Sequence, residues 1–124
     1  MELSQQKATV VFKIQSLLTG AVATQSPSLE MGDTQISVSR AFGWSRVTAV
    51  VTNIPAGVTF LTMDGPYGAH SGYSNRPGQT STSFGQYAGL ALCLPDDTLI
   101  WTVKAYDAQG IVLSETQLFL KLTD

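Results

Sequence analysis

The clearest pattern along the chain is an alternation of side chains within the stretch Leu94–Glu115. One set of alternate positions is Leu99, Trp101, Val103 and Ala105, and the other is Ile100, Thr102, Lys104 and Tyr106. A period of two is typical of a β-strand with one buried face. Asp107–Gly110 then ends in glycine, as hairpin turns often do, and Ile111–Glu115 begins a return strand. The pattern predicts a β-hairpin with Trp101 and Leu99 in the protein core.

Further segments have the alternation or the β-branched composition of strands. They are Thr9–Leu18, Thr34–Arg40, Arg46–Ile54, Val58–Met63, Ala88–Leu94 and Leu113–Leu122. Asn53–Gly57 has the composition of a turn, so Arg46–Ile54 and Val58–Met63 are expected to form a second hairpin. No helical periodicity extends beyond about two turns.

Short strands at this spacing predict an all-β protein. We expect an antiparallel β-sandwich of about seven to eight strands, immunoglobulin-like, in a single domain of residues 1–124. A jelly roll or a small barrel is the alternative.

The hairpin resembles the penultimate and last strands of fibronectin type III and related immunoglobulin-like domains. Those strands often read Tyr-x-Val-x-Val-x-Ala-x-Asp before a glycine turn. Here Trp101 and Val103 occupy the two valine positions. Ala105 and Asp107 match directly, and Leu99 stands where the family has tyrosine. The resemblance covers the hairpin alone and implies an immunoglobulin-like sandwich.

One long interval, Asp64–Tyr87, interrupts the series of strands. Its glycines and prolines predict irregular structure over residues 65–76, and Gln79–Phe84 is a candidate edge strand. Residues 65–76 are aromatic, polar and flexible, which is the composition of antibody binding loops. An aromatic platform for binding a sugar would combine aromatic residues of this interval with Trp44, which precedes the interval. The candidate ligand-binding residues are Trp44, Tyr67, His70, Tyr73, Asn75 and Arg76. The alternative is that the tyrosines fix the loop to its own domain.

The charge content is low for a globular protein. Charged residues make up 13% of the chain, against about 25% in ordinary soluble domains. Much of the polar surface must therefore be serine and threonine, which favours an extracellular or virion surface. The net charge of −2 and the scattered basic residues argue against a nucleic-acid partner. No apolar run approaches the ~20 residues of a membrane span. Glu2 and Lys13 do not fit a signal peptide.

The sequence contains no recognisable catalytic or metal-binding constellation. Cys93 and His70 are each the single residue of their type, so a disulfide, a zinc site or a Cys-His pair is not expected. Cys93 is expected to be a small buried side chain, and Asp96-Asp97 is a turn signature. We therefore expect no enzyme activity and no cofactor. The favoured function is a non-catalytic structural or interaction module of a virion surface, tail or cell-surface assembly, and the alternative is a carbohydrate-binding module.

Apolar residues on both faces of two strands predict self-association or contact with other protein subunits. In Arg46–Ile54, Val50 and Ile54 lie opposite Val47 and Val51, and in the last strand Phe119 opposes its leucine neighbours. One of the two faces would point to solvent in a two-layer sandwich. Another subunit, or the long interval folded back over the sheet, would cover it.

Overall fold

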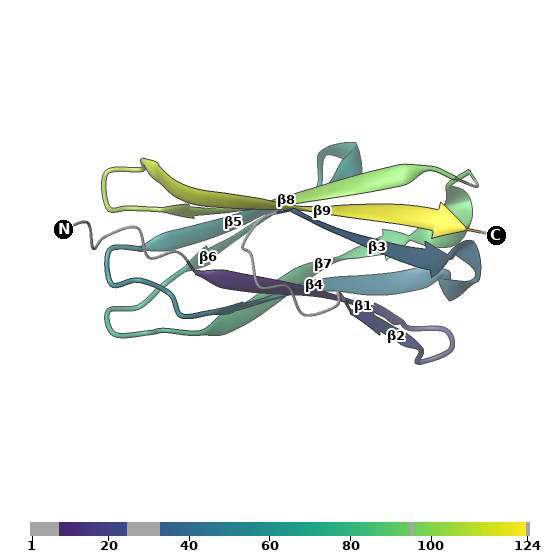
Figure 1. Cartoon of the computed structure of the whole chain (residues 1–124), viewed down its shortest axis with the longest axis horizontal. Coiled ribbons are helices and arrows are strands. Elements are labelled where there is room, and N and C mark those ends of the chain that lie inside the picture. The colour runs from purple at the N-terminus through teal and green to yellow at the C-terminus, as the bar shows by residue number, and fades with distance from the viewer. Residues whose placement is uncertain (1–7, 25–32, 95, 124) are drawn as a thin grey trace.

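The computed structural model describes residues 8–24, 33–94 and 96–123, and within them the chain forms two β-sheets packed face to face (Figure 1). The strands are β1 (Thr9–Ser16), β2 (Val22–Thr24), β3 (Thr34–Ser39), β4 (Trp44–Thr52), β5 (Phe60–Asp64), β6 (His70–Ser74), β7 (Thr82–Gly89), β8 (Thr98–Tyr106) and β9 (Val112–Thr123). Three short 3-10 helices are η1 (Arg40–Phe42), η2 (Pro66–Gly68) and η3 (Leu90–Leu92).

The two sheets have different strand orders. The four-stranded sheet is antiparallel with the order β2-β1-β4-β7, and the five-stranded sheet has the order β3-β9-β8-β5-β6. In the second sheet β3 runs parallel to β9 and the other pairs are antiparallel. The predicted all-β sandwich is confirmed. The described residues form nine strands rather than seven or eight, one sheet is mixed, and the sheets do not close into a barrel.

The predicted hairpin is confirmed as β8 and β9, which pair antiparallel. Leu99, Trp101, Val103 and Ala105 are all buried. The Asp107 carboxylate fixes the turn, because its Oδ1 accepts hydrogen bonds from the backbone N–H groups of Gln109 and Ile111, both at 2.9 Å. Pro95, which the sequence places before this hairpin, lies outside the described residues.

The second predicted hairpin is wrong. β4 and β5 belong to different sheets, so residues 53–57 cross the end of the sandwich instead of joining paired strands. Ile54 and Val58 are both buried there, and the Ile54 N–H donates to the Thr80 carbonyl at 2.9 Å. Burial of these two apolar side chains holds the connection against the core. Ile54 therefore belongs to the core and not to a second apolar face, while Val50 is half-buried.

The predicted strand Ala88–Leu94 is also wrong beyond its first two residues. β7 ends at Gly89 and the chain turns into η3, where Leu90 is buried and Leu92 is exposed. The Leu90 N–H donates to the Gly43 carbonyl at 3.0 Å, which draws Leu90 under the sheet. Leu90 and Leu92 belong to this 3-10 turn and do not line one face of a strand.

The interval expected to be irregular contains strand β6, and β7 begins within it at Thr82. β6 pairs with β5 although it contains Gly72, because the ring of Phe60 lies across that position. A Cβ on Gly72 would lie 2.8 Å from Phe60 Cζ, so a side chain at this position would require the Phe60 ring to move. Glycine here makes room for an aromatic neighbour and does not mark a loop.

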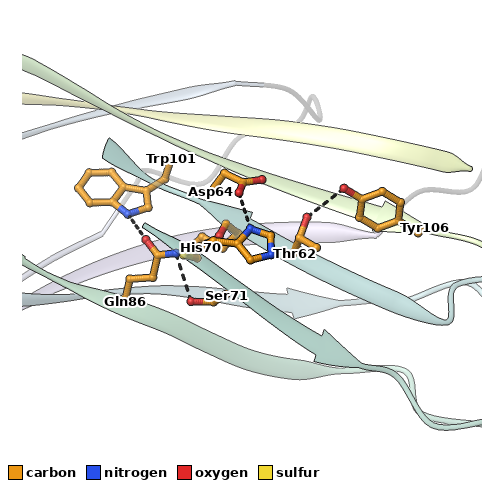
Figure 2. A network of polar contacts seen from close by, with 8 residues as sticks. Thr62, Asp64, His70, Ser71, Gln86, Trp101 and Tyr106 are labelled. Carbon is orange, nitrogen blue, oxygen red and sulfur yellow. Dashed lines mark hydrogen bonds and ion pairs between the residues drawn. The ribbon is translucent and has the colours of Figure 1, made fainter. Parts of the chain in front are cut away.

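A polar cluster in the core joins the two sheets. Gln86 of β7 is buried, and its Oε1 accepts a hydrogen bond from Trp101 Nε1 of β8 at 2.9 Å. Its Nε2 donates to the Met63 carbonyl of β5 at 2.9 Å and to Ser71 Oγ of β6 at 3.1 Å. Figure 2 shows the Gln86 side chain between Trp101 and Ser71. One amide thus connects the four-stranded sheet to three strands of the other sheet.

Replacement of Gln86 by alanine tests this connection. Gln86→Ala leaves the buried Trp101 N–H without its acceptor, and an unsatisfied buried polar group costs about 1–3 kcal/mol. We expect that loss in the free energy of unfolding, measured by urea denaturation. Gln117→Ala is the matched control, because Gln117 Nε2 donates to Thr102 Oγ1 at a half-buried position and its loss should cost about 1 kcal/mol or less. Equal losses in both variants would contradict the role assigned to Gln86.

Candidate functional site

A pocket opens between the sheets where η2 faces the end of β7. Its volume is about 220 Å³. Trp101, Leu99 and Gln86 from the core line it on the inside, and the remaining lining residues include the exposed aromatic side chains Trp44 and Tyr87. No group of three or more potential metal-ligating side chains lies together in the described part of the chain.

Two aromatic rings and a guanidinium group lie together at the pocket. Trp44 and Tyr87 are 56% and 53% exposed, and their rings are stacked with centroids 6.0 Å apart and planes inclined by 7°. Arg46 lies opposite Tyr87 in the β4–β7 register, with its Cζ 5.2 Å from the Tyr87 ring centroid. Trp44 lies opposite Gly89, and a Cβ at Gly89 would be in van der Waals contact with the indole, 3.4 Å from its Cε3. The strand register therefore assembles a flat surface with one positive charge beside it.

Tyr67 holds an unfavourable backbone conformation beside the same pocket. Its φ of 62° is in the left-handed region, and its side chain is 85% exposed. The phenol oxygen lies 3.7 Å from the sulfur of buried Cys93. This hydrogen bond, followed by the electrostatic interaction with Cys93, by partial desolvation and by the charge of Asp97, raises the pKa of the Tyr67 phenol above its ordinary value. Strained exposed residues are often found at binding sites.

The approach of η2 to the core depends on Gly65. A Cβ at this position would overlap Gln86 Oε1 and lie 2.5 Å from Trp101 Nε1. The backbone before η2 therefore packs directly on the hydrogen bond between Gln86 and Trp101. The same amide that joins the sheets also sets the position of Tyr67 at the pocket.

The structure does not bring the six candidate residues together. Trp44 and Tyr67 line the pocket, but His70 lies on the face of β6 opposite to Ser71, with its Nδ1 2.5 Å from Asp64 Oδ1 (Figure 2). Asp64 and His70 are directly opposed in the β5–β6 register and both are solvent-exposed in part. Their contact is an exposed ion pair at the sheet edge when the imidazole is protonated.

Tyr73, Asn75 and Arg76 lie at the other end of β6. The Tyr73 hydroxyl accepts a hydrogen bond from Gln79 Nε2 at 2.8 Å, and its ring stacks on Phe84. Hydrogen bonds with Thr82 and Gln79 lower the pKa of the Tyr73 phenol.

Asn75 organises the same loop. Its Nδ2 donates to the Val58 and Gln79 carbonyls, each at 3.2 Å, while the Arg76 N–H donates to Gln79 Oε1. Tyr73 and Asn75 thus connect the β6–β7 loop to its own domain. A single platform of six residues is not formed.

The pocket adjoins a larger exposed apolar surface, which we call the apolar end: Leu18, Trp44, Tyr67, Tyr87 and Leu92. A Cβ at Gly89 would lie 3.4 Å from both Leu92 Cδ1 and Trp44 Cε3. A Cβ at Gly43 would lie 3.4 Å from Leu18 Cδ2. Gly89 therefore lies between Leu92 and Trp44, and Leu18 lies against Gly43, the residue before Trp44. Leu92 is 90% exposed.

The sequence did not identify Tyr87, Arg46 or Leu92 as members of this site. Tyr87 closes the long interval Asp64–Tyr87, and Leu92 belongs to the segment Ala88–Leu94 that was predicted to be a strand. Their proximity to Trp44 depends on the β4–β7 register and on the turn into η3, which involve residues far apart in the chain. The available signal in the sequence was that Gly43 precedes Trp44 and that Gly89 stands between Tyr87 and Leu92.

The chemistry of the site is that of apolar contact with few polar groups. Gln86 makes three hydrogen bonds within the protein, and the Cys93 sulfur is buried. The Tyr67 hydroxyl and the Arg46 guanidinium remain as the polar groups beside the aromatic rings. The arrangement suits a ligand or partner with an apolar face.

No protein-family model matches the sequence, and no curated protein is detectably similar to it. Within the described residues no helix is long and apolar enough to cross a membrane.

The strain at Tyr67 gives a direct test. Tyr67→Gly removes a left-handed tyrosine, which costs about 1–2 kcal/mol, and adds the flexibility of glycine, which costs about 0.5–1 kcal/mol. We expect the free energy of unfolding in urea to stay the same or rise by up to about 1 kcal/mol. In the control Ala69→Gly, at φ −63°, we expect a decrease of about 0.5–1 kcal/mol. A larger loss in Tyr67→Gly than in the control would show that the contact with Cys93 outweighs the strain.

Proposed function

We propose that this protein is a non-catalytic interaction module that assembles with copies of itself or with other subunits through its apolar end. The observation that carries the proposal is the group of exposed side chains at this end of the domain, Leu18, Trp44, Tyr67, Tyr87 and Leu92, three of which line one pocket. Large apolar patches are uncommon on monomeric proteins and often mark interaction sites. Burial of such a surface is favourable by about 25 cal/mol per Å² before the costs of association.

The low charge content supports the same proposal. Only 13% of the residues are charged, so little electrostatic repulsion opposes the approach of a second subunit. Aromatic residues and arginine are enriched at protein interfaces, and both are present here as Trp44, Tyr87 and Arg46. Together these residues have the composition that is typical of the centre of a protein–protein interface.

An immunoglobulin-like assignment of the sandwich is part of the proposal. One sheet contains the neighbours β1-β4-β7, which correspond to strands A, B and E of immunoglobulin-like domains. The other sheet contains the neighbours β5, β8 and β9, which correspond to strands C, F and G. The resemblance of the β8–β9 sequence to fibronectin type III domains points the same way. Such sandwiches occur in many cell-surface proteins. By this analogy we propose that the chain belongs to a virion surface, tail or cell-surface assembly. The fold alone does not determine a function, so the proposed function depends on the apolar end.

The proposal predicts self-association that depends on the apolar end. We expect the mean mass in sedimentation velocity to rise above 13.2 kDa with increasing protein concentration. Leu92→Asp should reduce this rise, because it places a charge in the surface to be buried. The control Val11→Asp changes an exposed apolar residue on β1 that does not belong to the apolar end, and should associate like the wild type. A constant mass of 13.2 kDa at all concentrations would contradict self-association.

Carbohydrate binding is the second candidate function. The stacked Trp44 and Tyr87 rings with Arg46 beside them are the feature that favours it, since sugars bind to aromatic faces flanked by polar groups. On a glycan array we expect saturable binding that Trp44→Ala abolishes. His70→Ala is the control, because His70 is exposed outside the pocket and paired with Asp64. Binding lost in His70→Ala but kept in Trp44→Ala would contradict this site.

A further inference from the structure

A second exposed apolar feature lies at the tip of the β8–β9 hairpin. Ile111, Val112 and Leu113 are consecutive and exposed, Ile111 to 61%; we call them the hairpin tip. Figure 1 shows the β8–β9 turn at one end of the long axis, and the β3–β4 and β7–β8 connections at the other end. The apolar end includes Trp44, which begins β4, and Leu92, which follows β7. The two apolar features therefore lie at opposite ends of one domain.

The backbone presents the hairpin tip in a fixed conformation. Ala105 pairs with Ser114 and Tyr106 with Val112, so Leu113 is the extra residue of a β-bulge. A bulge redirects a side chain from its place in the ladder. The Asp107 N–H donates to the Ile111 carbonyl at 3.0 Å, and the Asp107 carboxylate holds the turn. A preorganised tip loses little conformational entropy on docking.

The pocket beside the apolar end matches the size of such a tip. An engineered apolar cavity of about 150 Å³ binds benzene, and this pocket has about 220 Å³. An isoleucine or leucine side chain therefore fits inside, with its neighbours against Trp44 and Tyr87. The polar groups that line the pocket lie at its edge or are already bonded within the protein, as for Gln86.

We propose that the hairpin tip of one copy docks on the apolar end of the next copy, with an aliphatic side chain of Ile111–Leu113 in the pocket. This inference rests on the proposed function and specifies its partner and geometry. A rigid domain cannot bring its own two ends together, so each tip needs a second molecule. One head-to-tail contact covers both apolar features, whereas a symmetric contact between two apolar ends leaves both tips exposed.

Charge complementarity favours the same pairing. Arg46 lies at the apolar end, where the charge of Asp97 also reaches Tyr67, and Asp107 and Glu115 lie on either side of the hairpin tip. Lys104 is opposite Glu115 in the β8–β9 register, yet the two form no ion pair within the described part of the chain. Arg46 likewise has no carboxylate partner among the described residues. The acidic flanks of the tip would approach the guanidinium group in the complex.

A mixing experiment with two variants tests this geometry. Leu92→Asp damages the apolar end and keeps the tip. The double variant Ile111→Asp with Leu113→Asp damages the tip and keeps the apolar end. Each variant alone should remain at 13.2 kDa in sedimentation velocity, at concentrations where the wild type associates. An equimolar mixture should form a dimer, because one intact tip can still meet one intact apolar end. The dimer cannot grow further, since both of its free ends are damaged.

Three results would overturn the inference. The first is association of the tip variant to the wild-type extent while Leu92→Asp abolishes it, which leaves the proposed function intact. The second is absence of a dimer in the mixture, which shows that the hairpin tip of one copy does not bind the apolar end of another. The third is a wild type that stays monomeric, which also removes self-association from the proposed function. Ile111→Gln with Leu113→Gln replaces the aspartate variant if circular dichroism shows that the latter does not fold.

Discussion

The hydrogen bond between Trp101 and Gln86 is the contact on which the rest of the structure depends. It satisfies the indole N–H inside the core, and the other end of the same amide holds β5 and β6. A buried polar group of this kind is stable only when all its partners are present, so it fixes the relative position of the two sheets. Gly65 packs on this bond, and η2 with Tyr67 follows from it. Gln86 and Trp101 also line the pocket, so this polar cluster forms part of its inner wall.

The sequence predicted the features that depend on neighbouring residues. The β8–β9 hairpin followed from alternation and from the Asp107–Gly110 turn, and burial of Trp101 followed from its phase in the strand. The errors concern distant partners. Nothing local shows that residues 53–57 pass between sheets, or that Gly72 makes room for Phe60. Local composition predicted which residues prefer strands, and tertiary contacts decided where those strands pair.

The candidate site was predicted in part for the same reason. Trp44 and Tyr67 were identified because exposed aromatic residues beside glycines are recognisable in a sequence. Their neighbours Tyr87 and Leu92 were missed, because the β4–β7 register and the turn into η3 bring them there. Tyr73 carries the same chemical groups as Tyr67 but faces Phe84 in the interior. Side-chain type alone does not distinguish a tyrosine that anchors a loop from one that meets a partner.

The parallel pairing of β3 with β9 has a consequence for the order of folding on the ribosome. Ile36 pairs with Leu120 and Val38 with Leu122, and Thr123 Oγ1 donates to the Val38 carbonyl across 85 residues of chain. β3 therefore cannot find its place until synthesis has reached the end of β9. Contacts of such sequence separation form slowly, because a long loop must close before they are gained. Until then the nascent chain carries an unpaired strand, and a chaperone or rapid release would protect it from aggregation.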